Sequence, residues 1–265
     1  MQQTYSRKLE QVIDLARYPL DDAAFRARCK QQVDLSGVLV MPDFLQPSAV
    51  ASIRAEGEAS KHLAFYTSSN HNIYLSPPDP AFPADHARNR EVASSKGCIT
   101  TDQVPGDSAL HILYEDESFK AFLCAVLGED RLYEYADPLS SINLHFADRG
   151  QELGWHFDNS SFAITLMIQS AEEGGVFEYV SNVRDADAGE MNYADAAKVL
   201  DGEVPVKTLA LDAGALVLFR GRNSMHRVTP NAGSRTRMLA VLAYNTEPGV
   251  ALSENARMTF FGRLG

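Results

Sequence analysis

Residues 154–169 read Gly-Trp-His-Phe-Asp-Asn-Ser-Ser-Phe-Ala-Ile-Thr-Leu-Met-Ile-Gln, and this stretch decides the fold that the sequence predicts. Its second half, Phe162–Gln169, is an apolar run of the kind that forms a buried strand. Its first half holds His156 and Asp158, whose i, i+2 spacing puts both side chains on one side of an extended chain. We therefore expect this pair to open a strand after Gly154, with an imidazole and a carboxylate pointing to the same place.

Short strand-like segments dominate the C-terminal half of the chain. The expected strands cover residues 141–146, 162–169, 175–180, 206–211, 215–219, 226–229 and 237–244. An acidic, alanine-rich insertion at 185–202 interrupts them and is expected to carry a helix at about 193–200.

Helical patterns dominate the N-terminal half. Helices are expected over much of residues 1–33, at 47–61 and twice within 107–128, and a single buried strand is expected at 37–41. Residues 66–106 contain a proline-rich stretch, which predicts a surface loop or a lid over the site.

Helices followed by short strands with glycine turns are typical of a jelly-roll barrel flanked by helices. We predict an α+β protein of one domain, residues 1–265. Residues 1–130 form its mainly helical part with the lid loop, and residues 131–250 form the jelly-roll core.

The composition bears on the partners and the location that we expect for the protein. A formal net charge of −11 argues against an electrostatic grip on nucleic acid or on an anionic membrane surface. The first residues do not show the basic segment followed by an apolar run that is typical of a signal peptide, and no apolar run reaches the length expected of a membrane span. Three widely spaced cysteines predict free thiols in a reducing cytoplasm rather than a disulfide framework. Nothing in the sequence indicates an oligomeric state.

His156 and Asp158, together with His226, predict a metal site. His226 follows a strand-and-turn segment farther along the chain. Two imidazoles and one carboxylate on one face of a metal ion leave the other positions open, as non-haem Fe(II) oxygenases require. A lone buried histidine is more often a core residue, and the His-x-Asp pattern is common by chance. The strand context of all three residues favours the metal site.

Arg237 lies inside the apolar run that follows His226, where a charge needs a buried partner. A guanidinium there would clamp the far carboxylate of 2-oxoglutarate through a bidentate contact. Arg235 has the same strand parity and stays the alternative, although it lies nearer a turn. Thr165 and Asn143, on predicted strands, are candidates for further contacts to 2-oxoglutarate.

Four segments resemble the Fe(II)/2-oxoglutarate oxygenase superfamily, and more narrowly the bacterial group of the free-lysine radical halogenase and its amino-acid hydroxylase relatives. They are Gly154–Asp158, Gly214–Phe219, His226–Pro230 and Arg237–Tyr244. The resemblance implies a double-stranded β-helix (jelly-roll, cupin-like) fold, with iron on His156, Asp158 and His226 and with 2-oxoglutarate on Arg237. Halogenases of this group replace the carboxylate ligand with a small residue to admit halide. Asp158 is present here, which implies hydroxylation.

The sequence thus predicts a dioxygenase that uses Fe(II), 2-oxoglutarate and O2 to hydroxylate an unactivated C–H bond of a small molecule. A free amino acid or an amino-acid derivative is the expected substrate, and His145, Asn159 and Arg222 are candidate contacts to it. Desaturation, cyclisation or a carrier-bound substrate are alternatives at the same iron site. A non-catalytic jelly-roll binding module is disfavoured, because it has no use for the charge of Arg237.

Overall fold

The computed structural model describes residues 8–265, so the first seven residues of the predicted N-terminal helical region lie outside it. The strands are β1 (Val38–Met41), β2 (Phe65–Asn72), β3 (Glu91–Ile99), β4 (Ile142–Ala147), β5 (Leu153–His156), β6 (Ala163–Gln169), β7 (Phe177–Val180), β8 (Lys207–Leu209), β9 (Leu216–Phe219), β10 (Met225–Val228) and β11 (Arg237–Leu242). The helices are α2 (Ala23–Ser36), α3 (Pro47–Ser60), α4 (Ala109–Glu115), α5 (Glu117–Leu127), α6 (Tyr193–Leu200) and α7 (Glu254–Phe261), with short 3-10 turns at Lys61–Leu63 and Thr101–Gln103.

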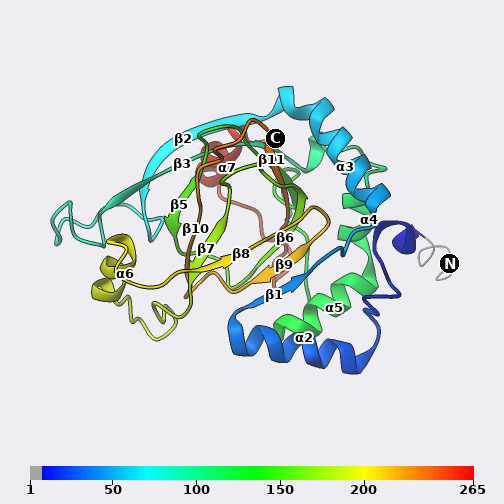
Figure 1. Ribbon diagram of the computed structural model, residues 1–265, viewed down its shortest axis with the longest axis horizontal. Coiled ribbons are helices and arrows are strands. Elements are labelled where there is room, and N and C mark those ends of the chain that lie inside the picture. Colours follow the sequence, from blue (N-terminus) through cyan, green and yellow to red (C-terminus); the bar gives the residue numbers. More distant parts are fainter. Residues whose placement is uncertain (1–7) are drawn as a thin grey trace.

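All strand pairs are antiparallel, and the sheet curls into an open barrel whose cross-section faces the viewer in Figure 1. The strand order is β1-β9-β6-β11-β4-β3-β5-β10-β7-β8, with β2 paired to β3. The turn from one wall to the other passes through β3, which pairs with β4 over three positions and with β5 at only one. The predicted double-stranded β-helix is therefore confirmed.

Alternation along β11 separates two environments. Met238, Ala240 and Leu242 are buried in the main core with residues of the helical layer. Arg237 and Leu239 face the other way, into the barrel. The same strand thus anchors the helices on one face and presents functional side chains on the other.

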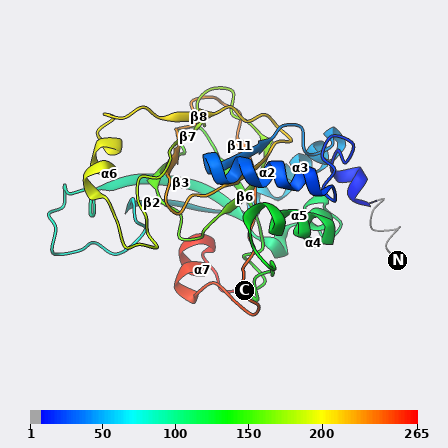
Figure 2. The same ribbon diagram turned by 90° about the horizontal axis from the view of Figure 1, so that it is seen from below.

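Helices α2, α3, α4 and α5 cover the outside of the wall that contains β1, β9, β6, β11 and β4 (Figures 1 and 2). Helix α5 buries Phe119, Phe122, Leu123 and Val126, a spacing that makes one continuous apolar stripe. Its N-terminus is capped by the carboxylate of Asp116, which accepts a hydrogen bond from the backbone N–H of Phe119. Expected and observed helices agree closely here, because amphipathic spacing and capping are local signals.

The structure differs from the irregular loop expected at residues 66–106, because most of this segment forms two strands. Strands β2 and β3 form a long hairpin that arches over the barrel in Figure 1, and only residues 73–90 between them lack strand structure. Most side chains of β2 are exposed, so its sequence Phe-Tyr-Thr-Ser-Ser-Asn-His-Asn shows no apolar alternation. A strand that is held mainly by backbone pairing leaves little pattern in its side chains.

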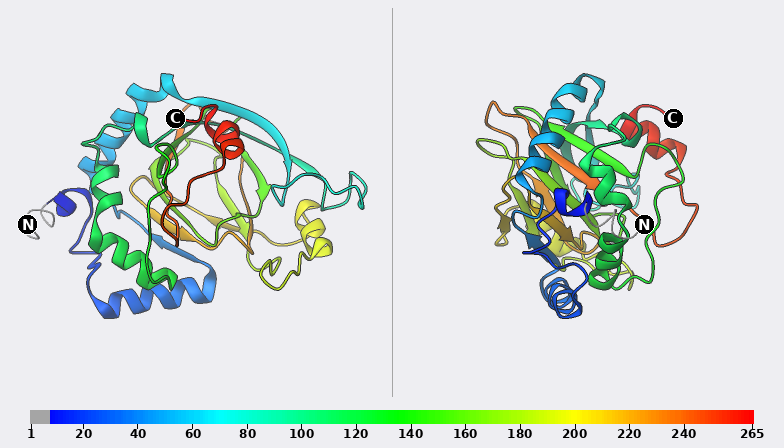
Figure 3. Two further views of the ribbon diagram at one scale, coloured as in Figure 1. Left: turned by 180° about the vertical axis from the view of Figure 1, so that it is seen from behind. Right: turned by 90° about the vertical axis from the view of Figure 1, so that its right-hand side faces the viewer.

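Two further differences concern the chain ends. The first helix ends at residue 12, and turns occupy residues 15–17 before α2 begins after its cap, Asp22. Helix α7 was not expected. It lies on the face of the barrel that the left panel of Figure 3 shows, next to β2 and β3. Its Phe261 packs with Cys98 of β3. Across residues 8–265, no helix has the length and apolarity needed to cross a membrane.

Candidate metal and co-substrate site

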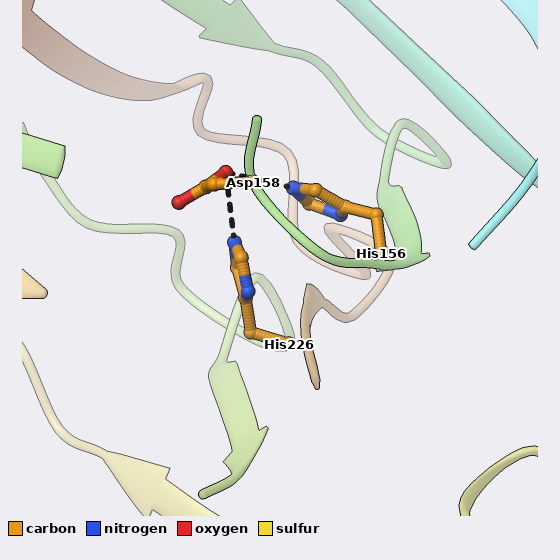
Figure 4. A group of neighbouring side chains, drawn as sticks. All are labelled: His156, Asp158 and His226. Carbon is orange, nitrogen blue, oxygen red and sulfur yellow. Dashed lines mark ion pairs between the residues drawn. The ribbon is translucent and has the colours of Figure 1, made fainter. Parts of the chain in front are cut away.

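His156, Asp158 and His226 come together at one end of the barrel, and Figure 4 shows both imidazoles turned toward the carboxylate. His156 is the last residue of β5, and His226 lies on β10 directly opposite it in the strand register. Asp158 lies in the turn beyond β5, so the pair closes a strand rather than opening one. The carboxylate is aimed by this turn, whose Asp158 N–H donates to the carbonyl of Gly221 at 3.1 Å.

Both histidines point their Nε2 atom toward the carboxylate of Asp158. Nδ1 of His156 lies 2.8 Å from the carbonyl oxygen of Gly154, and Nδ1 of His226 lies 3.0 Å from that of Ser224. A proton on each Nδ1 donates to these carbonyls and leaves the Nε2 lone pairs free to bind a metal. The backbone thereby sets both tautomers.

The donor atoms have the spacing of a metal site. Oδ1 of Asp158 lies 3.7 Å from Nε2 of His156 and 3.4 Å from Nε2 of His226, and the three donor atoms lie within 4.8 Å of one another. Ligands bound at about 2.1 Å and at right angles are roughly 3 Å apart. Two nitrogens and one carboxylate oxygen also match the donor preference of Fe(II).

Asp158 is prepared for a cation that the protein itself does not supply. Its Oδ2 is buried and has no hydrogen-bond partner among residues 8–265. Gly221 makes the space for this carboxylate, because a Cβ there would overlap Oδ2 and lie 2.6 Å from Cγ of Asp158. These residues therefore fit an iron ion.

The charges within the group favour the metal-binding forms of His156 and Asp158. Burial and the neighbouring His226 lower the pKa of His156, so its imidazole is neutral. Burial alone would raise the pKa of Asp158, but the charge of His226 and its hydrogen bond to the carboxylate outweigh burial and hold the pKa below the usual value. A neutral imidazole and an ionised carboxylate are the forms that bind a divalent cation.

Arg237 is a buried cation that forms no ion pair with any of residues 8–265. It is 5% exposed, and its Nε has no hydrogen-bond partner among the described residues. Burial lowers its pKa to about 10, which still leaves the guanidinium charged at neutral pH. Gly175 lets the stem pass close to the backbone, since a Cβ there would lie 3.1 Å from Cδ of Arg237. Arg235, by contrast, is exposed and its Nε donates to the carbonyl of Ser170.

A cavity of about 290 Å³ inside the barrel joins these groups, since the triad and Arg237 all line it. Of the other predicted site residues, Thr165 and His145 line the cavity. Asn143 is buried nearby, and its amide donates to the carbonyls of Leu139 and Ile142. Asn159 and Arg222 lie outside the lining. The Arg222 guanidinium binds Asp187 and the carbonyl of Asn159.

Lys96 on β3 also lines the cavity, and sequence reasoning missed it. It lies in the hairpin that was expected to be an irregular loop, so no strand parity was available to point it inward. The sequence shows a lysine at this position, but only the structure shows that it lies beside His145 in the cavity.

The comparisons with known proteins agree with this geometry. Residues 84–258 match the family described as halogenase D. No curated protein sequence matches the chain. Among solved structures, an oxidoreductase of the 2-oxoglutarate–Fe(II) oxygenase family from Burkholderia pseudomallei aligns with a TM-score of 0.54 at 14% identity, covering 85% of this chain and 92% of that one.

Two further structures have a similar fold. The α-ketoglutarate-dependent carbocyclase SnoK of nogalamycin biosynthesis aligns with a TM-score of 0.58 at 14% identity, covering 87% of this chain and 89% of that one. HygX from Streptomyces hygroscopicus, solved with nickel, 2-oxoglutarate and hygromycin B, aligns with a TM-score of 0.55 at 17% identity. This alignment covers 88% of this chain and 95% of HygX. At such identities the likeness concerns the fold.

Proposed function

Because this chain belongs to the halogenase D family, among the Fe(II)- and 2-oxoglutarate-dependent oxygenases, we propose that it hydroxylates an unactivated C–H bond of a small amino-acid-like molecule. The single observation that carries the proposal is the carboxylate of Asp158 beside two histidine Nε2 atoms. The enzyme uses Fe(II), 2-oxoglutarate and O2.

The chemistry that iron, 2-oxoglutarate and O2 supply when bound is oxidation of the C–H bond, coupled to conversion of 2-oxoglutarate to succinate and CO2. The residues of this chain hold and orient these reactants. His156, His226 and Asp158 hold the iron from one side. Arg237 would hold the far carboxylate of 2-oxoglutarate, since a buried guanidinium can donate two charge-assisted hydrogen bonds to a carboxylate, and this would orient the keto acid.

Asp158 favours hydroxylation over halogenation. A halide needs a coordination position on the iron, and in this chain a protein carboxylate is placed to take it. The backbone is adapted to that carboxylate, because Gly221 leaves the space that Oδ2 fills. A small residue at position 158 would leave this space empty for an anion.

The walls of the cavity favour a small substrate and exclude water. The apolar lining includes Leu153, Phe162, Ile164, Phe177, Val217, Phe219, Val228 and Leu239. A volume of about 290 Å³ is at the lower end of ligand pockets and must also hold 2-oxoglutarate. Apolar walls around the reacting bond keep competing water away.

The test is a mass-spectrometric screen of free L-amino acids and their simple derivatives with the iron-loaded protein, 2-oxoglutarate and O2. We expect one compound to gain a single oxygen atom in step with succinate release. The matched control is His226→Ala, which should release no succinate. A loss of two hydrogens would instead establish desaturation. No coupled product and no succinate from any compound would support a binding module.

A further inference from the structure

The cavity contains a second cationic group, to which the function proposed above assigns no role. Lys96 on β3 points into the barrel, and its Nζ lies 3.2 Å from each ring nitrogen of His145 on β4. His145 pairs in register with Cys98 of β3 on one side and with Leu239 of β11 on the other. Strand β4 thus lies between the strands that carry Lys96 and Arg237, and both cationic side chains line the cavity.

Lys96 has no acidic partner for its charge. Across residues 8–265, no carboxylate oxygen lies within ion-pair distance of its Nζ. A neutral imidazole accepts through only one nitrogen, so His145 satisfies at most one of the three donors of the ammonium. The other ring nitrogen then carries a proton and is a donor itself. Removing an ammonium from bulk water is costly unless a partner compensates it.

The known reactants leave this position free. 2-Oxoglutarate has two carboxylates: the one next to its keto group would bind at the metal, and the other is assigned to Arg237. A third anionic group is required to match Lys96. The substrate is the one reactant whose charge is not yet assigned.

We propose that Lys96, together with His145, binds a carboxylate of the substrate, so that the enzyme acts on small carboxylic acids held by their acid group. This inference rests on the function proposed above. One ammonium N–H and one imidazole N–H are two donors for the two oxygens of a carboxylate. The apolar walls accommodate the remaining carbon chain next to the metal.

The cavity recognises the acid group and not an ammonium group. Asp158 is the only acidic residue that lines it among the described residues, and that carboxylate is assigned to iron. The amino group of an amino acid therefore has no counter-ion inside the barrel. Tyr135 and Tyr244 line both this cavity and an outer depression that includes Glu134 and Asp130. An amino group directed outward would approach that acidic surface.

The experiment measures binding by calorimetry to the anaerobic, Fe(II)-loaded protein saturated with 2-oxoglutarate. The probes are pentanoate, its neutral analogue pentanamide, and propyl phosphate. We expect pentanoate to bind about ten- to a hundredfold more tightly than pentanamide, since a charge-assisted contact is lost with the amide. Lys96→Met should abolish this preference, and Lys96→Arg should restore part of it. Lys198→Met, at an exposed lysine of α6 that pairs with Asp195, is the matched control.

Three results would overturn the inference. They are equal affinity of the wild-type protein for pentanoate and pentanamide, tighter binding of propyl phosphate than of pentanoate, and a Lys96→Met variant that loses affinity for 2-oxoglutarate while keeping its preference for pentanoate. The last result would assign Lys96 to the co-substrate. Succinate release by the wild-type protein is measured separately. Its absence contradicts the proposed function and leaves the binding result readable.

Discussion

Gly221 lies against the carboxylate of Asp158, and their backbones are joined by the hydrogen bond from Asp158 N–H to the Gly221 carbonyl. No other residue type fits at position 221 without moving the carboxylate. A Cβ would overlap Oδ2 of Asp158 and lie 2.9 Å from Cε1 of His226. The loop that precedes β10 thus shapes the metal site without contributing a ligand to it.

Gly221→Ala should therefore weaken metal binding. We expect an affinity for Fe(II) about ten- to a hundredfold lower, the range found when groups that orient metal ligands are altered. Titration with a metal-sensitive dye measures it. Gly106→Ala is the control, because a Cβ at Gly106 meets nothing within 4 Å. Unchanged affinity in the Gly221 variant would mean that Asp158 binds no metal.

Asp158→Ala should abolish hydroxylation, because one of the three ligands is lost, and should lower metal affinity by at least about a hundredfold. The vacated space also gives chloride access to the metal. Product mass spectra with and without chloride measure both effects. Asp195→Ala, on the exposed face of α6, is the control. Hydroxylation at the wild-type rate in the Asp158 variant would remove this residue from the site.

Arg237→Ala should raise the KM for 2-oxoglutarate by about ten- to a hundredfold, since a charge-assisted, bidentate contact in a buried position is lost. Arg237→Lys should recover only part of the loss, because an ammonium lacks the planar pair of donors. Arg235→Ala is the matched control. Steady-state succinate release against 2-oxoglutarate concentration measures all three. A larger effect at Arg235 than at Arg237 would reverse the assignment.

The affinity for pentanoate should fall as the pH rises. Burial lowers the pKa of Lys96, although Cys98 and Asp158 act in the opposite direction. The free amine therefore forms at a lower pH than in an ordinary lysine, whose pKa is about 10.4. Binding needs the ammonium, so it is strong below the lowered pKa and lost above it. His145 stays neutral throughout, because burial and the charges of Lys96 and Arg237 lower its pKa.

Calorimetric titrations at a series of pH values check this. Lys96→Arg should remove the alkaline fall, because arginine stays charged. The same fall in the Lys96→Arg variant would assign it to another group.

The jelly-roll strands and the N-terminal helices were predictable because short apolar runs and amphipathic spacing are local signals. The apolar run at 162–169 became β6, and the predicted helix at 193–200 is α6. The hairpin of β2 and β3 was not predictable, since its outer strand is mostly exposed on both faces. Lys96 lies on β3 of this hairpin, and without a predicted strand nothing in the sequence indicated that its side chain points into the cavity.

The amino-acid sequence by itself determined which groups are available: two histidines and an aspartate next to strands, and an arginine within an apolar run. These are local properties of residue type and spacing. Only the tertiary structure decided that Asp158 is aimed by a turn against Gly221, and that Lys96 and His145 share the cavity with Arg237. Such relationships arise where strands that are distant in the chain close a barrel, and no local pattern encodes them.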